Sequence, residues 1–540
     1  MTPADAAAGS PRRVPGAVEQ FKQDRIVGWV AVADDAPASR VTLEVNGQRV
    51  AATWSSEPDD SRRNWGVVRP FRFWLRDLWD FLSPDDAITV CFDGRPLPIA
   101  RRGMLARPET AGERSVTELF ELLAADHIFG QTGRLQLSKT VDTAWQRDVL
   151  ALFGEVRALL ADRYDYDPFF VYGTLLGAVR EQGFIGHDLD FDSAYVSRHT
   201  DGAAAAAELR DIAFALVAAG YAVESFLTHL HIVDAAGTRI DLFHLYFDDE
   251  GRLSFPFGIA GPGRITRDEW QGVHEIEFLG HRGVVPRQAE RLVEHMYGRD
   301  WRDPKPGFMW YLDRTDRAPA GIMPPDMVEE IRWQDHYSRS AMQEPSPFAR
   351  RLTALADLPA TVVDLGAGDG RDAVAFADAG VRSVTAMERA PAALDLLRGS
   401  AAGRAGRVDA VEVDLADAAA LREAIAQALT RRPDGTGPVL YLLRFVLHAV
   451  DEETERTLLD VLAGVTVPGD LLAVEFRTRA DEDLPKARTG PRRRFLDGDA
   501  FLAEVGARMA TDVVERSEGT GLSPVPGEDP QLCRLVLRRV

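Results

Sequence analysis

Residues 361–372 read TVVDLGAGDGRD, an apolar run that leads into three glycines at alternate positions. The pattern predicts a buried strand, a tight turn and then a helix. Glycine adopts backbone angles that other residues avoid, and it lets a ligand approach the backbone closely. A GxGxG turn after a strand is compatible with several nucleotide ligands. This stretch therefore predicts a nucleotide-type site in an α/β domain.

Two further apolar runs downstream each end in an acid. Residues 383–387 lead to Glu388, and residues 409–413 lead to Asp414. An acid after the second strand can accept hydrogen bonds from both hydroxyls of a ribose, and an acid after the third is suited to an adenine amino group. Strand and helix patterns alternate from residue 325 to the end, which predicts a parallel sheet with crossover helices.

Together, the segments DLGAGDGRD, MER and EVDLAD resemble the class I S-adenosylmethionine (SAM)-dependent methyltransferases, and the likeness covers residues 325–540. The resemblance implies a Rossmann-like methyltransferase domain with SAM as cofactor. A Rossmann-like domain that binds no cofactor stays open as an alternative. The cofactor-binding residues that the resemblance implies are Asp364, Gly366, Gly368, Gly370, Glu388 and Asp414.

A fourth apolar run, residues 439–443, leads to a polar group that we interpret as the acceptor side of this site. Ligands in such folds bind beyond the carboxyl ends of the strands. The candidates are Arg444, His448, Glu475 and Arg477, with further positive charge from residues 492–494. The arginines suggest an anionic acceptor, with structural salt bridges as the alternative. Methyl transfer requires mainly proximity and alignment, so a dedicated base is not required.

The middle of the chain carries a second chemical pattern, FFVYGTLLGAVREQGFIGHDLDFD at residues 169–192. It predicts a strand, a Gly-Thr turn, a short helix and a strand with aspartates at alternate positions. Residues i and i+2 of a strand face the same side, so Asp188, Asp190 and Asp192 are expected to project together. Carboxylates gathered in this way repel one another unless a cation lies between them. Oxygen ligands of this kind suit Mg²⁺ or Mn²⁺.

A third strand-like run, residues 238–243, places Asp241 among apolar neighbours. A buried carboxylate without a partner is costly, so we expect Asp241 to bind the same metal. The alternative is a solvated acidic loop that binds nothing.

The segment GTLLGAVREQGFIGHDLDFD resembles the signature of the LicD-type nucleotidyltransferase-fold family, which includes phosphocholine transferases and fukutin-related sugar-phosphate transferases. The later segments IDLFHLY and FLGHRGVVPRQAERLVEHMYGRDWRDPKP extend the likeness over residues 135–307. One departure is HDLD at residues 187–190, where family members often carry a Trp-Asp-Asp-Asp run. This departure makes the role of Asp188 less certain than that of Asp190 and Asp192.

The resemblance implies an α+β nucleotidyltransferase-like domain that transfers a phosphate-linked group from a CDP-linked donor to a glycan hydroxyl. Such transfer needs charge neutralisation and in-line placement, which one or two cations on Asp190, Asp192 and Asp241 would supply. Gly173 and Thr174 would let the backbone approach the donor phosphates. Arg180 is a candidate partner for a phosphate oxygen, or else part of a structural salt bridge.

The first 100 residues are predicted to form a small β-sandwich from short strands and turns. Asn46-Gly47 and Asp93-Gly94 stand between strand-like runs and signal hairpins. No catalytic pattern occurs here. Several tryptophans could line a carbohydrate-binding face, although aromatic side chains more often fill a core; they are Trp29, Trp54, Trp65, Trp74 and Trp79.

The amino-acid composition argues against several classes of partner and site. The chain has 63 basic and 84 acidic residues, a formal net charge of −21, which disfavours nucleic acid as a partner. Only two cysteines occur, so neither a disulfide framework nor a Cys-rich zinc site is expected. No secretory signal or transmembrane run is apparent. We therefore expect a cytoplasmic protein, and peripheral membrane association stays open.

The 540 residues thus predict a multidomain α/β chain. We expect a β-sandwich accessory domain at 16–100, a LicD-type domain at 115–315 and a methyltransferase domain at 325–540, with a proline-rich boundary at 318–325. The expected function is a bifunctional enzyme of surface-glycan modification, with a glycan or glycolipid as acceptor. The alternatives are a methyltransferase whose LicD-like part only binds substrate, and a non-catalytic scaffold of a glycan-assembly complex.

Overall fold

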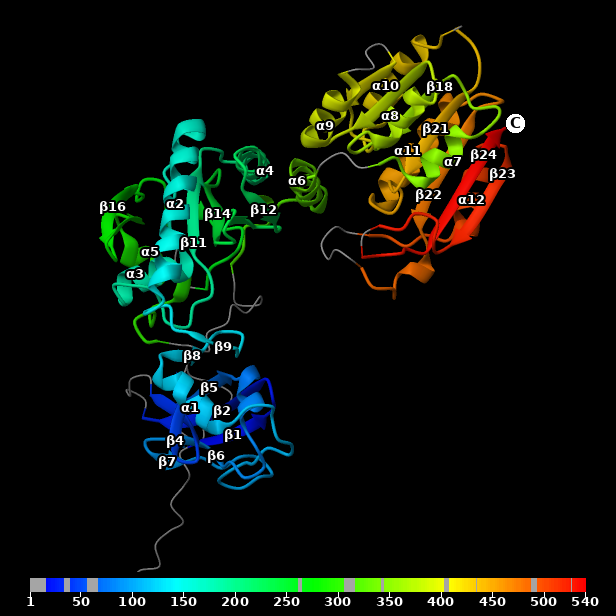
Figure 1. Cartoon of the computed structure of the whole chain (residues 1–540). Coiled ribbons are helices and arrows are strands. Elements are labelled where there is room, and N and C mark those ends of the chain that lie inside the picture. Colours follow the sequence, from blue (N-terminus) through cyan, green and yellow to red (C-terminus); the bar gives the residue numbers. More distant parts are fainter. Residues whose placement is uncertain are drawn as a thin grey trace, which may run out of the picture. The chain divides into compact units, whose positions relative to one another are not determined.

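The chain forms two compact units in the computed structural model, and each is described by itself (Figure 1). The first unit comprises Met1–Ile212 and Phe226–Met323, and the second comprises Ala213–Ser225 and Pro324–Val540. The structure describes residues 16–33, 39–55, 67–260, 265–304, 316–340, 344–402, 407–433, 435–486, 493–525 and 527–540. No helix among these residues has both the length and the apolar character needed to span a bilayer.

Two antiparallel sheets at the start of the first unit share one hydrophobic core. One sheet has the order β1-β2-β5 and the other β4-β3-β6-β7. The predicted Asn46-Gly47 hairpin is present, and both residues have the positive φ that a type I′ turn needs (52° and 79°). The strands are β1 (Gly16–Phe21), β2 (Arg25–Val32), β3 (Arg40–Val45), β4 (Gln48–Trp54), β5 (Val67–Trp74), β6 (Ile88–Phe92) and β7 (Arg95–Pro96).

The carbohydrate-binding face proposed for the tryptophans of this region stays a prediction. Trp29, Trp54, Trp74 and Trp79 are all partly buried, and Trp79 packs against the shared core. Trp65 lies outside the described residues.

The rest of the first unit is an α+β arrangement around a mixed sheet. Strands β10, β11, β14 and β13 are neighbours in that order, with β11 and β14 parallel and β13 antiparallel to β14. Aromatic side chains fill the space between the sheet and α2, where Phe153 contacts Phe170 and Phe191. The elements are α1 (Val116–Ala124), β8 (His127–Phe129), β9 (Leu135–Leu137), α2 (Thr143–Tyr164), β10 (Phe169–Phe170), α3 (Tyr172–Arg180), β11 (Asp192–Ser197), β13 (His229–Val233), β14 (Arg239–Phe247), β15 (Leu253–Ser254), β16 (Val273–Phe278), β17 (His281–Pro286), α5 (Ala289–Tyr297) and η4 (Pro319–Gly321).

The second unit is a Rossmann-like α/β fold. Its sheet has the order β20-β19-β18-β21-β22-β24-β23, with parallel strands from β20 to β22 and β24 antiparallel to β22. The elements are α6 (Pro325–Ser338), α7 (Pro347–Thr353), β18 (Thr361–Leu365), α8 (Arg371–Asp378), β19 (Ser383–Glu388), α9 (Pro391–Ala401), β20 (Val408–Glu412), α10 (Ala418–Thr430), β21 (Val439–Arg444), α11 (Glu452–Val465), β22 (Leu471–Arg477), α12 (Gly498–Gly506), β23 (Thr511–Gly519) and β24 (Leu532–Arg539).

Helices cover both faces of this sheet. Alternate residues of β18 enter two separate cores: Val363 packs with side chains of α10, α11 and α12, and Val362 packs with side chains of α7, α8 and α9. Because both faces are covered, the central strands are mostly apolar, as the sequence indicated. β18 has β19 on one side and β21 on the other, which is the switch point where such folds bind ligands.

Side chains cap the starts of several helices. The Asp142 carboxylate accepts the Trp145 N–H at 3.2 Å where α2 begins, and Asp417, Asp451 and Asp497 cap α10, α11 and α12 in the same way. A capping carboxylate satisfies backbone donors that have no partner within the helix. These aspartates are therefore structural.

Candidate functional sites

Two predicted metal ligands lie side by side on parallel strands of the first unit. Asp192 is the first residue of β11 and stands directly opposite Asp241 of β14. One carboxylate oxygen from each of Asp190, Asp192 and Asp241 lies within 4.8 Å of the other two. These residues thus form one acidic cluster, which the expectation of a shared metal site requires.

The prediction of a strand with aspartates at alternate positions is wrong, because most of this segment is a loop. Asp188 and Asp190 lie in the loop between α3 and β11, and a turn bond joins the Asp188 N–H to the Ile185 carbonyl at 3.1 Å. The strand begins only at Asp192. Phe191, which is fully buried, anchors the loop, so the aspartates converge through loop packing rather than through strand alternation.

Gly173 and Thr174, the residues expected near the donor phosphates, form hydrogen bonds that hold Asp192 in place. The Gly173 N–H donates to Asp192 Oδ2 at 2.9 Å, and the Asp192 N–H donates to Thr174 Oγ1 at 2.8 Å. The Thr174 side chain is buried and engaged in this contact. A Cβ atom on Gly173 would lie 2.6 Å from Asp188 Oδ2, so glycine is what lets the carboxylates approach the helix start.

The residue before Gly173 has a strained backbone. Tyr172 has a φ of 42°, in the left-handed region that a bulky side chain rarely adopts. Its hydroxyl donates to the Gly258 carbonyl at 3.1 Å. Strain of this kind collects at functional sites because the surrounding structure must hold it. No sequence pattern signals it, since tyrosine is not a left-handed residue by preference.

The electrostatics of the acidic cluster fit a divalent cation. Burial raises the pKa of Asp188, Asp190 and Asp192, and the neighbouring carboxylates raise it further. Within the described residues, Asp188 Oδ2 and Asp241 Oδ1 are buried and accept no hydrogen bond. Buried carboxylate oxygens normally have partners, and an all-oxygen donor set suits Mg²⁺ or Mn²⁺. The residues present therefore fit the metal that the sequence implied.

The Arg180 guanidinium forms hydrogen bonds with other residues of the protein. Its Nε donates to Glu181 Oε1 at 2.7 Å, and its Nη1 donates to the Trp301 carbonyl at 3.1 Å. The guanidinium thus joins the end of α3 to the segment after α5. This geometry favours the structural salt bridge over the phosphate contact.

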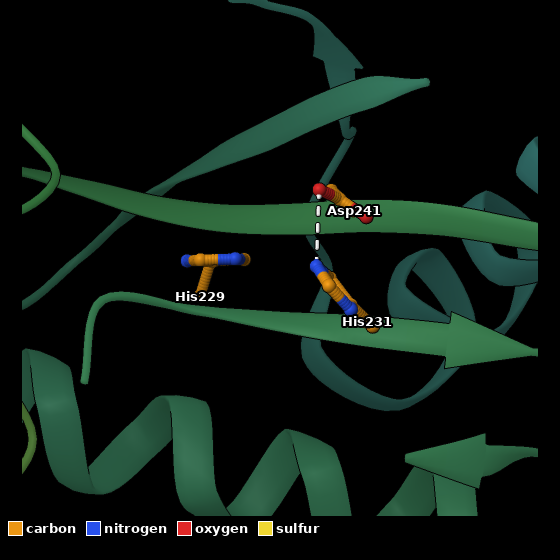
Figure 2. Close-up of side chains that lie close together, drawn as sticks. All are labelled: His229, His231 and Asp241. Carbon is orange, nitrogen blue, oxygen red and sulfur yellow. Dashed lines mark ion pairs between the residues drawn. The ribbon is translucent and has the colours of Figure 1, made fainter. Parts of the chain in front are cut away.

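Two histidines beside the acidic cluster were missed by the sequence analysis. His229 and His231 lie on β13, and His231 stands opposite Asp241 of β14 in the strand register (Figure 2). His231 Nε2 lies 3.4 Å from Asp241 Oδ2. The alternation His229-Leu230-His231 is the signal that could have revealed them, because such residues share one face of a strand.

The glycine loop of the second unit has the conformation that the sequence predicts. Gly366, Gly368 and Gly370 have φ values of 71°, 56° and 76°. The Gly368 N–H donates to Glu388 Oε2 at 3.0 Å, which joins the loop after β18 to the end of β19. A Cβ on Gly368 would lie 2.5 Å from the Tyr337 hydroxyl, so the close approach of α6 requires glycine here.

The acids predicted to bind SAM differ in their surroundings. Glu388 Oε1 accepts the N–H groups of Arg389 and Ala390, so the carboxylate is fixed by its own backbone turn. Asp414 follows β20, and its side chain is 45% exposed with Arg389 at 3.8 Å. Asp364 is buried, and its Oδ2 accepts no hydrogen bond from the described residues. Burial raises the pKa of Asp364 well above its usual value.

Tyr337 of α6 is a site residue that the sequence did not reveal. It is partly buried, and its hydroxyl lies over Gly368. No sequence motif marks this tyrosine. It reaches the glycine loop only because α6 packs against the rest of the second unit.

Glu475 and Arg477, expected on the acceptor side, have buried charge partners in the structure. Glu475 is fully buried and accepts from Arg534 Nε at 2.5 Å and from Ser523 Oγ. Arg477 pairs with Asp481 at 2.7 Å and also with Glu528. These pairs neutralise the charges inside the fold, so they give no support to an anionic acceptor.

Arg444 is also paired, but it lies at the edge of the site. Its Nε lies 3.1 Å from Glu475 Oε2, and its Cζ lies 4.3 Å from the centre of the Phe445 ring. Phe445 has a φ of 61°, a strained backbone at the carboxyl end of β21. We regard Phe445 as a further acceptor-side candidate. Of the predicted arginines 492–494, Arg494 pairs with Glu455 at 2.7 Å, and Arg492 lies outside the described residues.

His448 is buried, and its Nδ1 accepts the Arg477 N–H at 3.4 Å. Burial, followed by the nearby positive charges of Arg477, Arg493 and Arg444, lowers the pKa of His448 to about 3. The ring is therefore neutral near pH 7, and because Nδ1 accepts a hydrogen bond, its proton lies on Nε2.

The low pKa of His448 predicts how stability changes with pH. Below its unfolded pKa of 6.5 the unfolded chain binds a proton that the folded chain does not, so stability falls as the pH falls towards about 3. We expect His448→Gln to remove this contribution. The difference in unfolding free energy between wild type and variant should shrink by about 2 kcal/mol between about pH 6.5 and pH 5. Urea unfolding followed by circular dichroism measures it, and a constant difference would contradict the burial argument.

Comparisons with known proteins find likenesses among solved structures. No protein-family model matches the chain, and no curated protein matches it. The glycopeptide N-methyltransferase MtfA is 19% identical over 36% of this chain and 97% of its own, with a TM-score of 0.28. A SAM-dependent methyltransferase from Anabaena variabilis is 12% identical over 37% of this chain and 99% of its own, with a TM-score of 0.27. TehB from Haemophilus influenzae is 12% identical over 39% of this chain and 67% of its own, with a TM-score of 0.28.

Proposed function

We propose that the second unit binds SAM and transfers its methyl group to an acceptor. The contact between the Gly368 N–H and Glu388 carries this proposal, because it joins a glycine loop and an acid at the switch point of a Rossmann-like sheet. Glu388 Oε2 accepts the Gly368 N–H alone, so one of its two lone pairs would accept from a ribose hydroxyl. Asp414, partly exposed after the next strand, would accept from an adenine amino group.

The residues of this site would act mainly by position. SAM supplies an activated methyl group when bound. Gly368 and Tyr337 would shape the loop side, and Phe445, directly after β21, would line the acceptor side. Proximity and alignment account for most of the acceleration of such a transfer. His448, neutral and buried beside the Phe445 ring, is the residue that we propose to position the acceptor, through the N–H at Nε2.

We further propose that the first unit transfers a phosphate-linked group from a CDP-linked donor to a glycan hydroxyl. The observation in favour is the convergence of Asp190, Asp192 and Asp241, with buried carboxylate oxygens that accept no hydrogen bond from the described residues. These carboxylates would hold Mg²⁺ or Mn²⁺, which would neutralise donor phosphates. The likeness of residues 135–307 to the LicD-type family supplies the donor and acceptor classes. A cytoplasmic, glycan-modifying enzyme with two activities follows as the working function.

Binding measurements on the full chain distinguish the three functions. Calorimetry with SAM, and with CDP in the presence and absence of Mg²⁺, is the experiment. SAM binding together with Mg²⁺-dependent CDP binding is expected. SAM binding alone would leave a methyltransferase whose first unit only recognises substrate, and no binding of either ligand would favour a scaffold.

A further inference from the structure

His229, His231 and Asp241 offer metal-ligating atoms at a place that the acidic cluster does not explain. One such atom from each residue lies within 4.8 Å of the other two. Figure 2 shows the two histidines side by side on β13, with the His231 ring directed at Asp241 of the neighbouring strand. Two strands of one sheet supply all three residues, so the backbone holds the arrangement rigidly.

The donor atoms differ in chemistry from those of the acidic cluster. Asp190 and Asp192 add only oxygen to Asp241, whereas His229 and His231 add two imidazole nitrogens. Oxygen ligands suit Mg²⁺ and Mn²⁺, and imidazole suits zinc, copper and other transition metals. Asp241 belongs to both groups, and a carboxylate has two oxygens with which to serve two cations.

The surroundings of the histidines orient them as metal sites do. The His229 ring stacks on Phe226 and on Phe243, with ring centres 4.8 Å apart in each pair. Its Nδ1 lies 3.1 Å from the Thr228 hydroxyl. Contacts of this kind fix the plane of an imidazole and favour one tautomer, which is the usual task of the groups around a metal ligand.

One basic side chain competes for Asp241. Arg239 Nε lies 3.7 Å from Asp241 Oδ1, and the arginine side chain is 41% exposed. A side chain with that exposure can move into solvent at little cost, so it compensates the carboxylate in the metal-free chain without blocking a cation.

We propose that His229, His231 and Asp241 bind a divalent transition metal of the zinc class, next to a separate oxygen-lined position at Asp190 and Asp192. Asp241 is shared by the two positions. The inference concerns metal binding only, and it holds or fails independently of SAM binding and of any CDP-dependent transfer.

The test is metal binding by the full, metal-stripped chain. Cu²⁺ serves as a spectroscopic probe, because paramagnetic resonance counts the imidazole nitrogens bound to it. Zn²⁺ affinity is measured by equilibrium dialysis with excess Mg²⁺ present. We expect two bound imidazoles in the wild type, and Zn²⁺ binding that Mg²⁺ does not displace.

Single substitutions identify which residues bind the metal. His229→Gln and His231→Gln should each leave one imidazole and weaken Zn²⁺ binding about tenfold or more, since even loss of a group behind a ligand costs that much. His281→Gln, an exposed histidine on β17, is the matched control and should change neither the imidazole signal nor the Zn²⁺ affinity.

Three results would overturn the proposal. They are no imidazole signal in the wild type, displacement of Zn²⁺ by Mg²⁺, and unchanged affinity in both histidine variants. The wild-type signal decides the question even where a variant folds poorly, and circular dichroism of each variant identifies that case.

Discussion

Asp192→Asn is expected to reduce metal-dependent group transfer by at least about 100-fold, which corresponds to about 2.7 kcal/mol in the barrier. The substitution removes one negative charge from the proposed cation position and changes the side-chain volume little. An asparagine oxygen can still accept the Gly173 N–H that now bonds to Asp192 Oδ2. The loss should therefore come from the missing charge and not from a displaced loop.

The same substitution should leave the metal-free chain as stable as wild type or more stable. Asp192 is buried beside Asp188, Asp190 and Asp241, and removing one of several repelling carboxylates relieves an unfavourable interaction. Lost activity with retained stability is the pattern of a functional residue.

Turnover with a CDP-linked donor and Mg²⁺, together with thermal unfolding in chelator, measures both effects of Asp192→Asn. Asp249→Asn, at an exposed position after β14, is the control and should affect neither. If Asp192→Asn keeps more than about a tenth of the activity, the proposed role of the acidic cluster is wrong.

Glu388→Ala is expected to weaken SAM binding by about 10-fold to 100-fold, or roughly 1.4–2.8 kcal/mol. The carboxylate accepts three backbone N–H groups, from Gly368, Arg389 and Ala390. Its removal takes away the proposed ribose acceptor and also leaves the glycine loop without its tie to β19. Two losses from one substitution explain why the effect should be large.

Glu412→Ala is the matched control for Glu388→Ala. Glu412 stands next to Glu388 in the strand register, at the end of β20, but its side chain is exposed. Calorimetry should show wild-type SAM affinity for this variant. Equal affinities in Glu388→Ala and wild type would withdraw the SAM assignment from this loop.

Local patterns of the chain predicted much of the architecture correctly. The Asn46-Gly47 turn has the positive φ values expected, and the apolar runs near residues 361, 383, 409 and 439 all form strands of one sheet. These predictions are correct because turn geometry and strand burial depend on neighbouring residues in the sequence. The strand predicted at Asp188 and Asp190 is instead a loop. The packing of a loop can bring acidic residues together without any periodic pattern in the sequence.

Charge partners could not be read from the sequence in the same way. Arg477 and Glu475 were expected to face a ligand, but Asp481, Glu528 and Arg534 pair with them inside the fold. Glu528 and Arg534 lie more than 50 residues away in the sequence from the residues they pair with. No local pattern indicates which charges meet across such separations.

The sequence by itself determined the two chemical signatures, a glycine loop at residues 366–370 and three aspartates within residues 188–192, because each depends on residue types at fixed short spacings. Only the tertiary structure placed His231 opposite Asp241 and Tyr337 over Gly368. Strand pairing and helix packing join residues that are distant in the chain, and their register follows from burial of whole faces. For that reason, some residues of each site could not be predicted from the sequence.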